Sequence, residues 1–367
     1  MPPRASRAPR SQPATAEVGG VCRRRVWRAT ENSATNFKDH TDRSTTAQLH
    51  LRGHHQAPTA GSPTSLLDAA NRQSKRRRRY ARATMTSPER AAATDLRRTL
   101  STIGSGFDGV PAFVGHHAAL TTALHTAACS KGFSPTKGDA VVQANLLMRH
   151  VNRDLWALQT LAVRMTREHR LMTAKDSDSA AYFLFMSCDV HLFLVEARSL
   201  LDYLAQLIAL AAHQPGQIKV TSFNALRNWV AEHPARLDRV LGLDLAGLVR
   251  GCTWFDEVKA SRDAVVHRGG EALCMWSGTD EISFDLLMVP QAARVLQHIW
   301  KSRTGPFGDF RVYAALCFGR LVALVEDAAS IVRARLPLSS TNGSQISHTG
   351  LGILKEWMLL ALERLEG

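Results

Sequence analysis

The chain has 367 residues, of which 45% are hydrophobic, so it is long enough to bury the core of one large or two medium domains. Its 46 Lys and Arg residues outnumber its 32 Asp and Glu residues, which gives a net charge of +14. Residues 1–84 hold 17 of the basic and 5 of the acidic residues, a net of +12, and leave only +2 for residues 85–367. The high pI therefore reflects the tail and does not make the remaining chain a nucleic-acid-binding body.

The sequence lacks the patterns of several common sites. Its six cysteines are scattered without a CxxC pair, so they predict neither a zinc site nor a disulfide framework. It contains no His-Glu-x-x-His, no P-loop and no nucleophile elbow. No run approaches the ~18–20 uninterrupted apolar residues of a membrane helix, and the arginine-rich N-terminus lacks the apolar core of a signal peptide. We expect a cytoplasmic protein with no metal, no cofactor and no membrane partner.

Residues 1–84 are rich in Arg, Ser, Thr, Ala, Pro and Gly and poor in large apolar residues, a composition that predicts a disordered tail. The densest basic run, at residues 75–79, fits a phosphate-binding arm or a nuclear address, and equally a solvated tail. A third interpretation is that translation starts at Met85. Ser87 can then cap a helix whose first position is Pro88.

Residues 85–137 are expected to form an N-terminal helical segment, with helices at 88–101 and 115–130 and a turn at 131–138. Between the two helices, residues 104–109 spell GxGxxG. No strand is expected before these glycines and no helix opens directly from them. The segment therefore predicts a loop and not a dinucleotide-binding site.

The main domain is expected at residues 138–336. Apolar residues at three-to-four spacing predict a helix to about residue 172, and the next helix, at about 180–213, is apolar on nearly every side. Such a helix is expected to be buried centrally. Its polar residues form one stripe about a turn apart, at Glu196, Ser199, Asp202 or Tyr203, and Gln206. That stripe fits either internal pairing, for example of Glu196 with an arginine on a neighbouring helix, or a surface that faces Arg262 and His267 and holds Arg262 in place.

Short helices and one pair of strands complete the domain. Ser222 can cap a helix that stops before Pro234, and residues 241–258 lead into a helix that ends at residues 269–270. The remaining expected elements are a hairpin of segments 271–277 and 281–289, a helix from Pro290 to about 302, a long helix at 309–336, a linker at 337–349 and an amphipathic helix at 350–367. The last helix is expected to dock on the body or to bind a partner helix. Together these elements predict an all-α bundle with a small β-hairpin.

An arginine followed, after four to six intervening residues, by a histidine occurs several times, so the spacing alone selects none of these pairs. The pairs are Arg43/His50, Arg164/His169, Arg227/His233 and Arg262/His267. The first lies in the tail, the second lies in a charged run that fits a solvated helix face, and the third is a minor rival at the end of a short helix. Only the last, with the polar Asp263 after its arginine, closes a helix that is otherwise core-forming.

This pattern resembles the motif of the HEPN superfamily, in which an arginine and a histidine closing a helix serve metal-independent RNA cleavage. The resemblance covers roughly residues 138–335. It implies a HEPN-like helical bundle and an endoribonuclease, a toxin or defence effector, with Arg262, Asp263 and His267 as the catalytic residues. RNA is then the expected substrate, a second copy of the chain the expected partner, and an antitoxin protein a further candidate partner.

The residue types suit that chemistry. Cleaving RNA without a metal needs a base for the 2′-OH, an acid for the leaving 5′-oxygen and positive charge on the phosphate. His267 can transfer protons near neutral pH, Arg262 is a permanent fork-shaped phosphate ligand, and Asp263 is placed to orient the ring one turn away. The expected substrate-binding residues are Arg268, Glu196 and Asp202.

Arg262 and His267 leave an ideal helix about 140° apart, so one helix should not easily direct both at one phosphate. The resemblance implies a solution, because HEPN proteins pair two motifs across a symmetric dimer to form a composite cleft. The alternative is a HEPN-like module without catalysis, which binds nucleotide or a protein partner. A third interpretation is an unrelated helical protein, and the structural interpretation of Arg262, Asp263 and His267 is a surface ion-pair cluster that ends a helix.

Overall fold

The computed structural model describes residues 85–106, 109–130, 139–175, 178–268, 270–291, 294–338, 345–347 and 350–366. The chain divides into two units, and all the described residues belong to the second, Pro63–Gly367. The predictions about the tail and about the turn at 131–138 lie outside the described residues. The described chain is mostly helical with small antiparallel strand pairs, which confirms the all-α class with a minor hairpin.

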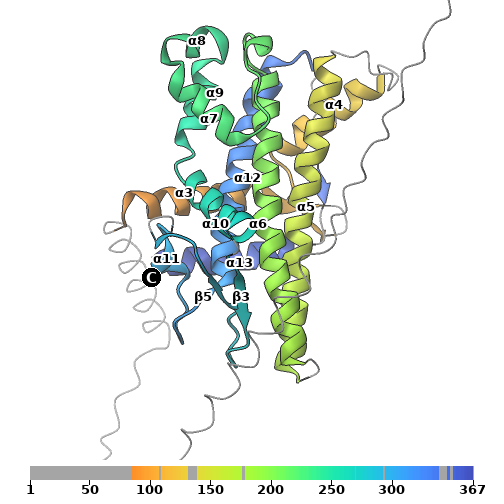
Figure 1. Ribbon diagram of the computed structural model, residues 1–367. Helices are drawn as coiled ribbons and strands as arrows, with labels where there is room; N and C mark the ends of the chain where they lie inside the picture. Colours follow the sequence, from red (N-terminus) through yellow and green to blue (C-terminus); the bar gives the residue numbers. More distant parts are fainter. Residues whose placement is uncertain are drawn as a thin grey trace, which may run out of the picture. The chain divides into compact units, whose positions relative to one another are not determined.

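Two long helices form the frame of the fold. α5 (Ala140–Thr173) and α6 (Ser179–Leu210) pack side by side, which confirms the two helices expected here (Figure 1). Asp139 and Asp178 cap them by accepting hydrogen bonds from N–H groups of the first turn. Contacts at three levels show that the pair is antiparallel, namely His150 on Tyr203, Arg164 with Asp189 and His169 with Tyr182.

α12 (Phe310–Arg335) is buried on nearly every side, and it confirms the long helix expected at 309–336. α3 (Ser87–Ser101), α4 (His116–Ser130) and α13 (Leu351–Glu366) pack against it. Gly319 lets α3 approach closely, because an added Cβ would lie 2.6 Å from the side chain of Leu96. The central helix of this unit is therefore α12.

Four short helices follow α6: α7 (Phe223–Glu232), α8 (Leu237–Val240), α9 (Leu243–Gly251) and α10 (Phe255–His267). Two single 3-10 turns, η3 (Pro215–Gln217) and η4 (Pro234–Arg236), flank α7. Ser222 caps α7 as predicted, with the N–H of Ala225 donating to its hydroxyl at 3.2 Å. The lead-in expected at 241–258 is broken twice, at Gly242, whose φ of 95° interrupts the helix, and at the turn before Phe255.

The hairpin expected after α10 is present. β3 (Ala272–Met275) pairs with β4 (Ser283–Leu286), and β5 (Gly308–Asp309) adds a third short strand. The helix expected from Pro290 to about 302 is right only for its C-terminal part, because among the described residues of this stretch the α-helix is α11 (Gln297–Trp300). Arg294 instead donates to the carbonyl of Leu286 and pairs with Asp285, which ties this segment back to β4.

A second small sheet was not predicted. β1 (Ile103–Ser105) pairs with β2 (Pro111–Phe113), which also pairs with β6 (Ile346–Ser347). The loop expected at 104–109 is therefore wrong for its first two residues, which belong to β1. Among the described residues, β2 follows this turn and no α-helix opens directly from it, which argues against a dinucleotide-binding loop. The linker expected at 337–349 likewise contributes a strand.

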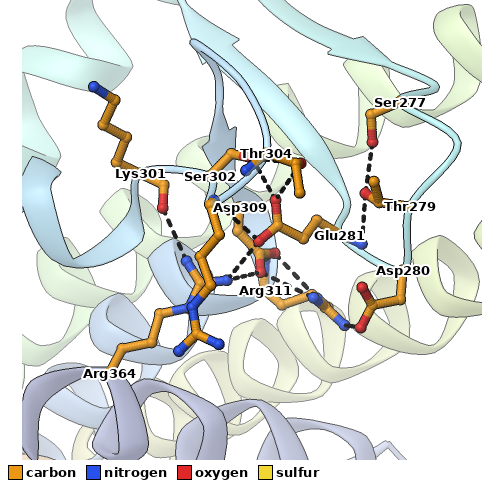
Figure 2. Close-up of polar contacts among 11 residues, drawn as sticks. Ser277, Thr279, Asp280, Glu281, Lys301, Ser302, Thr304, Asp309, Arg311 and Arg364 are labelled. Carbon is orange, nitrogen blue, oxygen red and sulfur yellow. Dashed lines mark hydrogen bonds and ion pairs between the residues drawn. The ribbon is translucent and has the colours of Figure 1, made fainter. Parts of the chain in front are cut away.

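The last helix docks on the body, which is one of its two expected roles. α13 packs against α12, α3 and α5. Near its end the buried Arg364 donates to Glu281 at 2.9 Å and to Asp309 at 2.7 Å (Figure 2). We call these three residues the Arg364 latch. Burial acts to raise the pKa of Glu281, but hydrogen bonds from the Ser302 hydroxyl and the Arg303 N–H, with the charge of Arg364, lower it below its usual value.

Candidate functional site

The Arg/His motif lies at the C-terminal end of α10. This helix packs against α6 and turns Phe255, Val258, Ala264 and Val265 inward, where all four are buried. The N–H groups of Arg268 and Gly270 both donate to the carbonyl of Ala264 and close the helix. An added Cβ on Gly270 would lie 2.8 Å from that carbonyl oxygen, so only glycine fits this sharp exit. The inward packing leaves the motif side chains on the outer face.

Arg262 and His267 are in direct contact within one chain. Arg262 Nη1 lies 2.5 Å from His267 Nε2 and 3.1 Å from Asp263 Oδ1. The 140° between the two positions on the helix therefore does not prevent contact between the side chains, and the expectation that one helix cannot easily direct both at one phosphate stays a prediction. The 140° between them describes where the side chains leave the helix, whereas the long arginine stem bends along the surface to reach the ring.

The contact assigns the hydrogen-bonding roles of the two side chains. An arginine guanidinium can only donate, so Arg262 is the donor and His267 Nε2 the acceptor. His267 is exposed, and Arg262 is partly buried with 28% of its side chain accessible. The motif therefore holds an imidazole ring against a guanidinium group at the protein surface.

Asp263 and Arg268 differ from their expected roles. Within the described chain Asp263 bonds to Arg262 and makes no hydrogen bond to His267, so it orients the guanidinium and not the ring. Arg268 is exposed at the helix end, and among the described residues no side chain pairs with it. It is free to reach a phosphate, as expected of a substrate ligand.

Asp202 lies on the motif side of α6. Its carboxylate accepts from the side chain of Arg198 and, at 2.8 Å, from the N–H of Phe223 at the start of α7. Burial raises the pKa of Asp202, whereas the Phe223 N–H, Arg198 and the charge of Arg262 act to lower it. Asp202 is thus within electrostatic range of the motif, and it holds Arg198 and α7 in place. Arg198 was not among the expected site residues, although its four-residue spacing from Asp202 is typical of such a pair.

Glu196 does not face the motif. Burial raises the pKa of Glu196, and Asp154 on α5 raises it further through charge and a shared hydrogen bond, while Arg153 opposes both effects. The neighbour of Glu196 on the adjacent helix is therefore another acid, Asp154, and not the arginine that the ion-pair interpretation of the polar stripe expected. Glu196 and Asp202, expected together at the substrate, are therefore on different sides of α6.

In the two other arginine–histidine pairs of the described chain, the side chains contact other residues and not each other. Arg227 forms a double hydrogen bond with Asp256 at 2.7 and 3.1 Å, while His233 stacks on Trp229 with ring centroids 4.9 Å apart. The prediction that Arg164 and His169 lie on a solvated helix face is wrong for the histidine, which is buried and forms a hydrogen bond with Tyr182 at 3.0 Å. Neither pair brings its two side chains together.

One side of α6 is apolar and exposed, contrary to the expectation that this helix is buried all round. We call this side the α6 stripe: Phe185, Cys188, Leu192 and Val195. These residues are three, four and three apart, the spacing of a coiled-coil seam. The neighbouring face carries Ser187 and His191, which bond β3, and Asp202 near Arg262. The stripe therefore borders the motif side of the helix.

Among the described helices, α6 is the one long and apolar enough to cross a membrane, a test that a buried core helix also passes. Helices α5, α7, α10 and α12 and strand β3 pack against it. The cytoplasmic location and the absence of a membrane partner stay predictions.

The motif is an open surface site. Cavities of about 700 and 530 Å³ are present elsewhere, and no motif residue lines either. Within the described part of the chain, no group of three His, Cys, Asp or Glu residues could hold a metal ion. Comparison with known proteins gives no match among family models, curated proteins or solved structures.

Proposed function

We propose that the protein is a metal-independent endoribonuclease of the HEPN type that acts as a homodimer. The observation that carries this proposal is the 2.5 Å contact between Arg262 and His267 on an exposed helix end. A guanidinium that can bind phosphate and an imidazole that can transfer a proton are two of the three groups that RNA cleavage needs, so this contact supports the proposal. The resemblance of the motif to the HEPN pattern, inside a helical bundle, supports the same activity.

The proposed reaction starts when an RNA phosphate draws Arg262 away from His267. Two phosphate oxygens match the guanidinium fork better than one ring nitrogen does. Freed of the arginine, His267 Nε2 takes the proton of the 2′-OH. The 2′-oxygen attacks phosphorus and the bond to the 5′-oxygen breaks. The products are a 2′,3′-cyclic phosphate and a 5′-hydroxyl, and no metal, water or cofactor enters this step.

The leaving 5′-oxygen needs a proton that the same ring cannot supply within one step. In a symmetric dimer the partner's His267, in its protonated form, donates that proton, and Arg268 lies free at the rim for a second phosphate contact. The α6 stripe is the proposed interface, because its heptad-like spacing is self-complementary about a two-fold axis and it borders the motif. Two open surface motifs then become one composite cleft.

The test is cleavage of mixed tRNA and mRNA by the full chain in EDTA, beside Arg262→Ala and His267→Ala. Each substitution should lower the rate at least a hundredfold, the scale of lost acid–base catalysis. Arg227→Ala is the matched control, since it removes an arginine of a rival pair outside the motif, and it should stay within threefold of wild type. Equal activity in all four proteins would assign cleavage to another site or to contamination.

A second candidate function follows from the open position of the motif. A surface cluster of Arg262, Asp263 and Arg268 beside an apolar helix face suits a module that binds nucleotide or a protein partner without cleavage. If a folded dimer binds RNA or a protein and cleaves nothing in the same assay, this function replaces the first. As a nuclease, the protein would act as a toxin or defence effector, with an antitoxin protein as the proposed inhibitor.

A further inference from the structure

We propose that a cavity between α3, α9, α10 and α12 binds an organic cation, an ammonium or guanidinium group on a short apolar stem. The cavity has a volume of about 530 Å³, and we call it the Asp95 cavity. It lies apart from the motif, because it is lined by the first turn of α10 and not by its last turn. This inference does not depend on the ribonuclease proposal.

Most of the cavity wall is apolar. Pro88, Leu248, Trp254, Val295 and Leu324 contribute to it from five separate parts of the fold. A wall of this kind favours a ligand with a hydrocarbon body, because burying apolar surface is favourable by about 25 cal/mol per Å². The wall alone would accept many ligands, so selectivity must come from its charged groups.

Four carboxyl groups line the cavity, and three of them have a partner. Asp327 forms a double hydrogen bond with Arg98, Asp256 does so with Arg227, and Glu257 accepts from Arg320 at 3.3 Å. Asp95 is the fourth, and it forms no hydrogen bond with any described residue. Three of the four carboxyl groups are thus hydrogen-bonded to an arginine, and Asp95 has no such cationic partner among the described residues.

The surroundings of Asp95 show the same shortage. Burial raises the pKa of Asp95 to about 6, the charges of Arg320 and Arg98 pull it down, and Asp327 pushes it up. Arg320 is itself buried and bonded to Glu257, whose pKa is also raised by burial. A single arginine therefore lies between two acids, the buried Glu257 and the partly exposed Asp95. A second positive charge beside Asp95 would stabilise its carboxylate and leave Arg320 to Glu257.

These features define the ligand. A positive end group donates hydrogen bonds to the Asp95 carboxylate, and the stem packs along Leu248, Trp254 and Leu324. An anion would meet four acids, and an apolar molecule would leave Asp95 desolvated without a partner. A free alkylamine or alkylguanidine and an arginine side chain of a partner protein share this chemistry.

The experiment is isothermal titration calorimetry of the full chain at pH 7.5 with butylguanidinium and hexylammonium, beside hexanoate and hexanol. Both cations should bind at one site and the other two should not. Asp95→Asn should weaken binding at least tenfold. Asp238→Asn, which removes an exposed carboxylate outside the cavity, should change it by less than twofold.

Gly247→Leu tests the location without touching Asp95. Gly247 lies on α9 at the cavity, and an added Cβ there would meet nothing within 4 Å, so a larger side chain can fill the space while the helix stays intact. This substitution should also weaken the cation at least tenfold. Lowering the pH to 5 should weaken wild-type binding about tenfold as Asp95 protonates, and should leave Asp95→Asn unchanged.

A peptide arm separates the two sources of the cation. A blocked Ala-Arg-Ala tripeptide that binds more tightly than butylguanidinium would indicate a partner's arginine, and the reverse order would indicate a free small cation. Hexanoate binding as tightly as hexylammonium, or cations that bind wild type and Asp95→Asn equally, would overturn the proposal.

Discussion

At the scale of single residues, the motif depends on one guanidinium that contacts both Asp263 and His267. Arg262→Lys keeps the positive charge but removes the planar fork and shortens the reach along the helix. We expect this substitution to lower kcat/KM for RNA at least tenfold. Arg268→Lys, at an exposed position that needs only charge, should stay within threefold. Equal losses in the two variants, measured side by side, would mean that the motif contributes charge and not geometry.

The second prediction for a single residue concerns Asp95 and the pH dependence of stability. Its pKa of about 6 in the folded chain lies above the ordinary value of 3.8, so the folded state favours the protonated acid. Stability from this group is present at low pH and is lost as the pH rises through 6. Asp95→Asn should therefore stabilise the protein at pH 7.5, by about 1–2 kcal/mol after allowing for its partial exposure. The gain should be much smaller at pH 4.5. Urea unfolding at the two pH values measures it, and a variant less stable than wild type at pH 7.5 would contradict the assignment.

The candidate residues could be predicted from sequence, but their contacts could not. Helical periodicity placed Arg262 and His267 at a helix end, where they lie. It fixes only the direction in which a side chain leaves the helix, so it missed that a flexible arginine reaches the ring. Helical periodicity also places Asp202 and Glu196 in one polar stripe. Only the packing of α5 and α10 against α6 shows that Glu196 faces Asp154 and that Asp202 faces the motif.

At the scale of elements, capped helices with strong apolar periodicity were predicted to within a few residues. Segments with weak local signals were not. The stretch after Pro290 has helix-forming residues, but the contacts of Arg294 with β4 hold it in turns. β1 and β6 are only three and two residues long, and they depend on pairing with β2. No short-range pattern records such distant partners.

At this scale we predict that the Arg364 latch stabilises the docking of α13 on the body. Arg364→Ala leaves the buried Glu281 without its cation and removes one of the two arginines on Asp309 (Figure 2). Breaking a buried pair in this way costs about 3–5 kcal/mol. Arg97→Ala is the matched control. Arg97 is a partly exposed residue of α3 that pairs with Glu366 on α13, so its loss should lower the free energy of unfolding by about 0–1 kcal/mol. Urea unfolding compares them, and similar midpoints for the two variants would show that the latch does not hold α13.

At the scale of the whole molecule, the account requires two copies of the chain. Leu192→Asp puts a charge in the middle of the α6 stripe, where 44% of the leucine surface is exposed. We expect light scattering to show a shift from dimer to monomer, and RNA cleavage to fall in parallel. Leu359→Asp, at a similarly exposed leucine on α13, should leave both unchanged. A wild-type monomer that cleaves RNA would refute the composite cleft.

The most direct measurement of the central claim is the chemistry of the RNA ends produced by the full chain in EDTA. We expect 2′,3′-cyclic phosphate and 5′-hydroxyl ends, formed by wild type and lost in His267→Ala and Arg262→Ala. Ends with a 3′-hydroxyl and a 5′-phosphate would require an attacking water in place of the 2′-OH. That result, or intact RNA in the presence of folded dimer, would contradict the account.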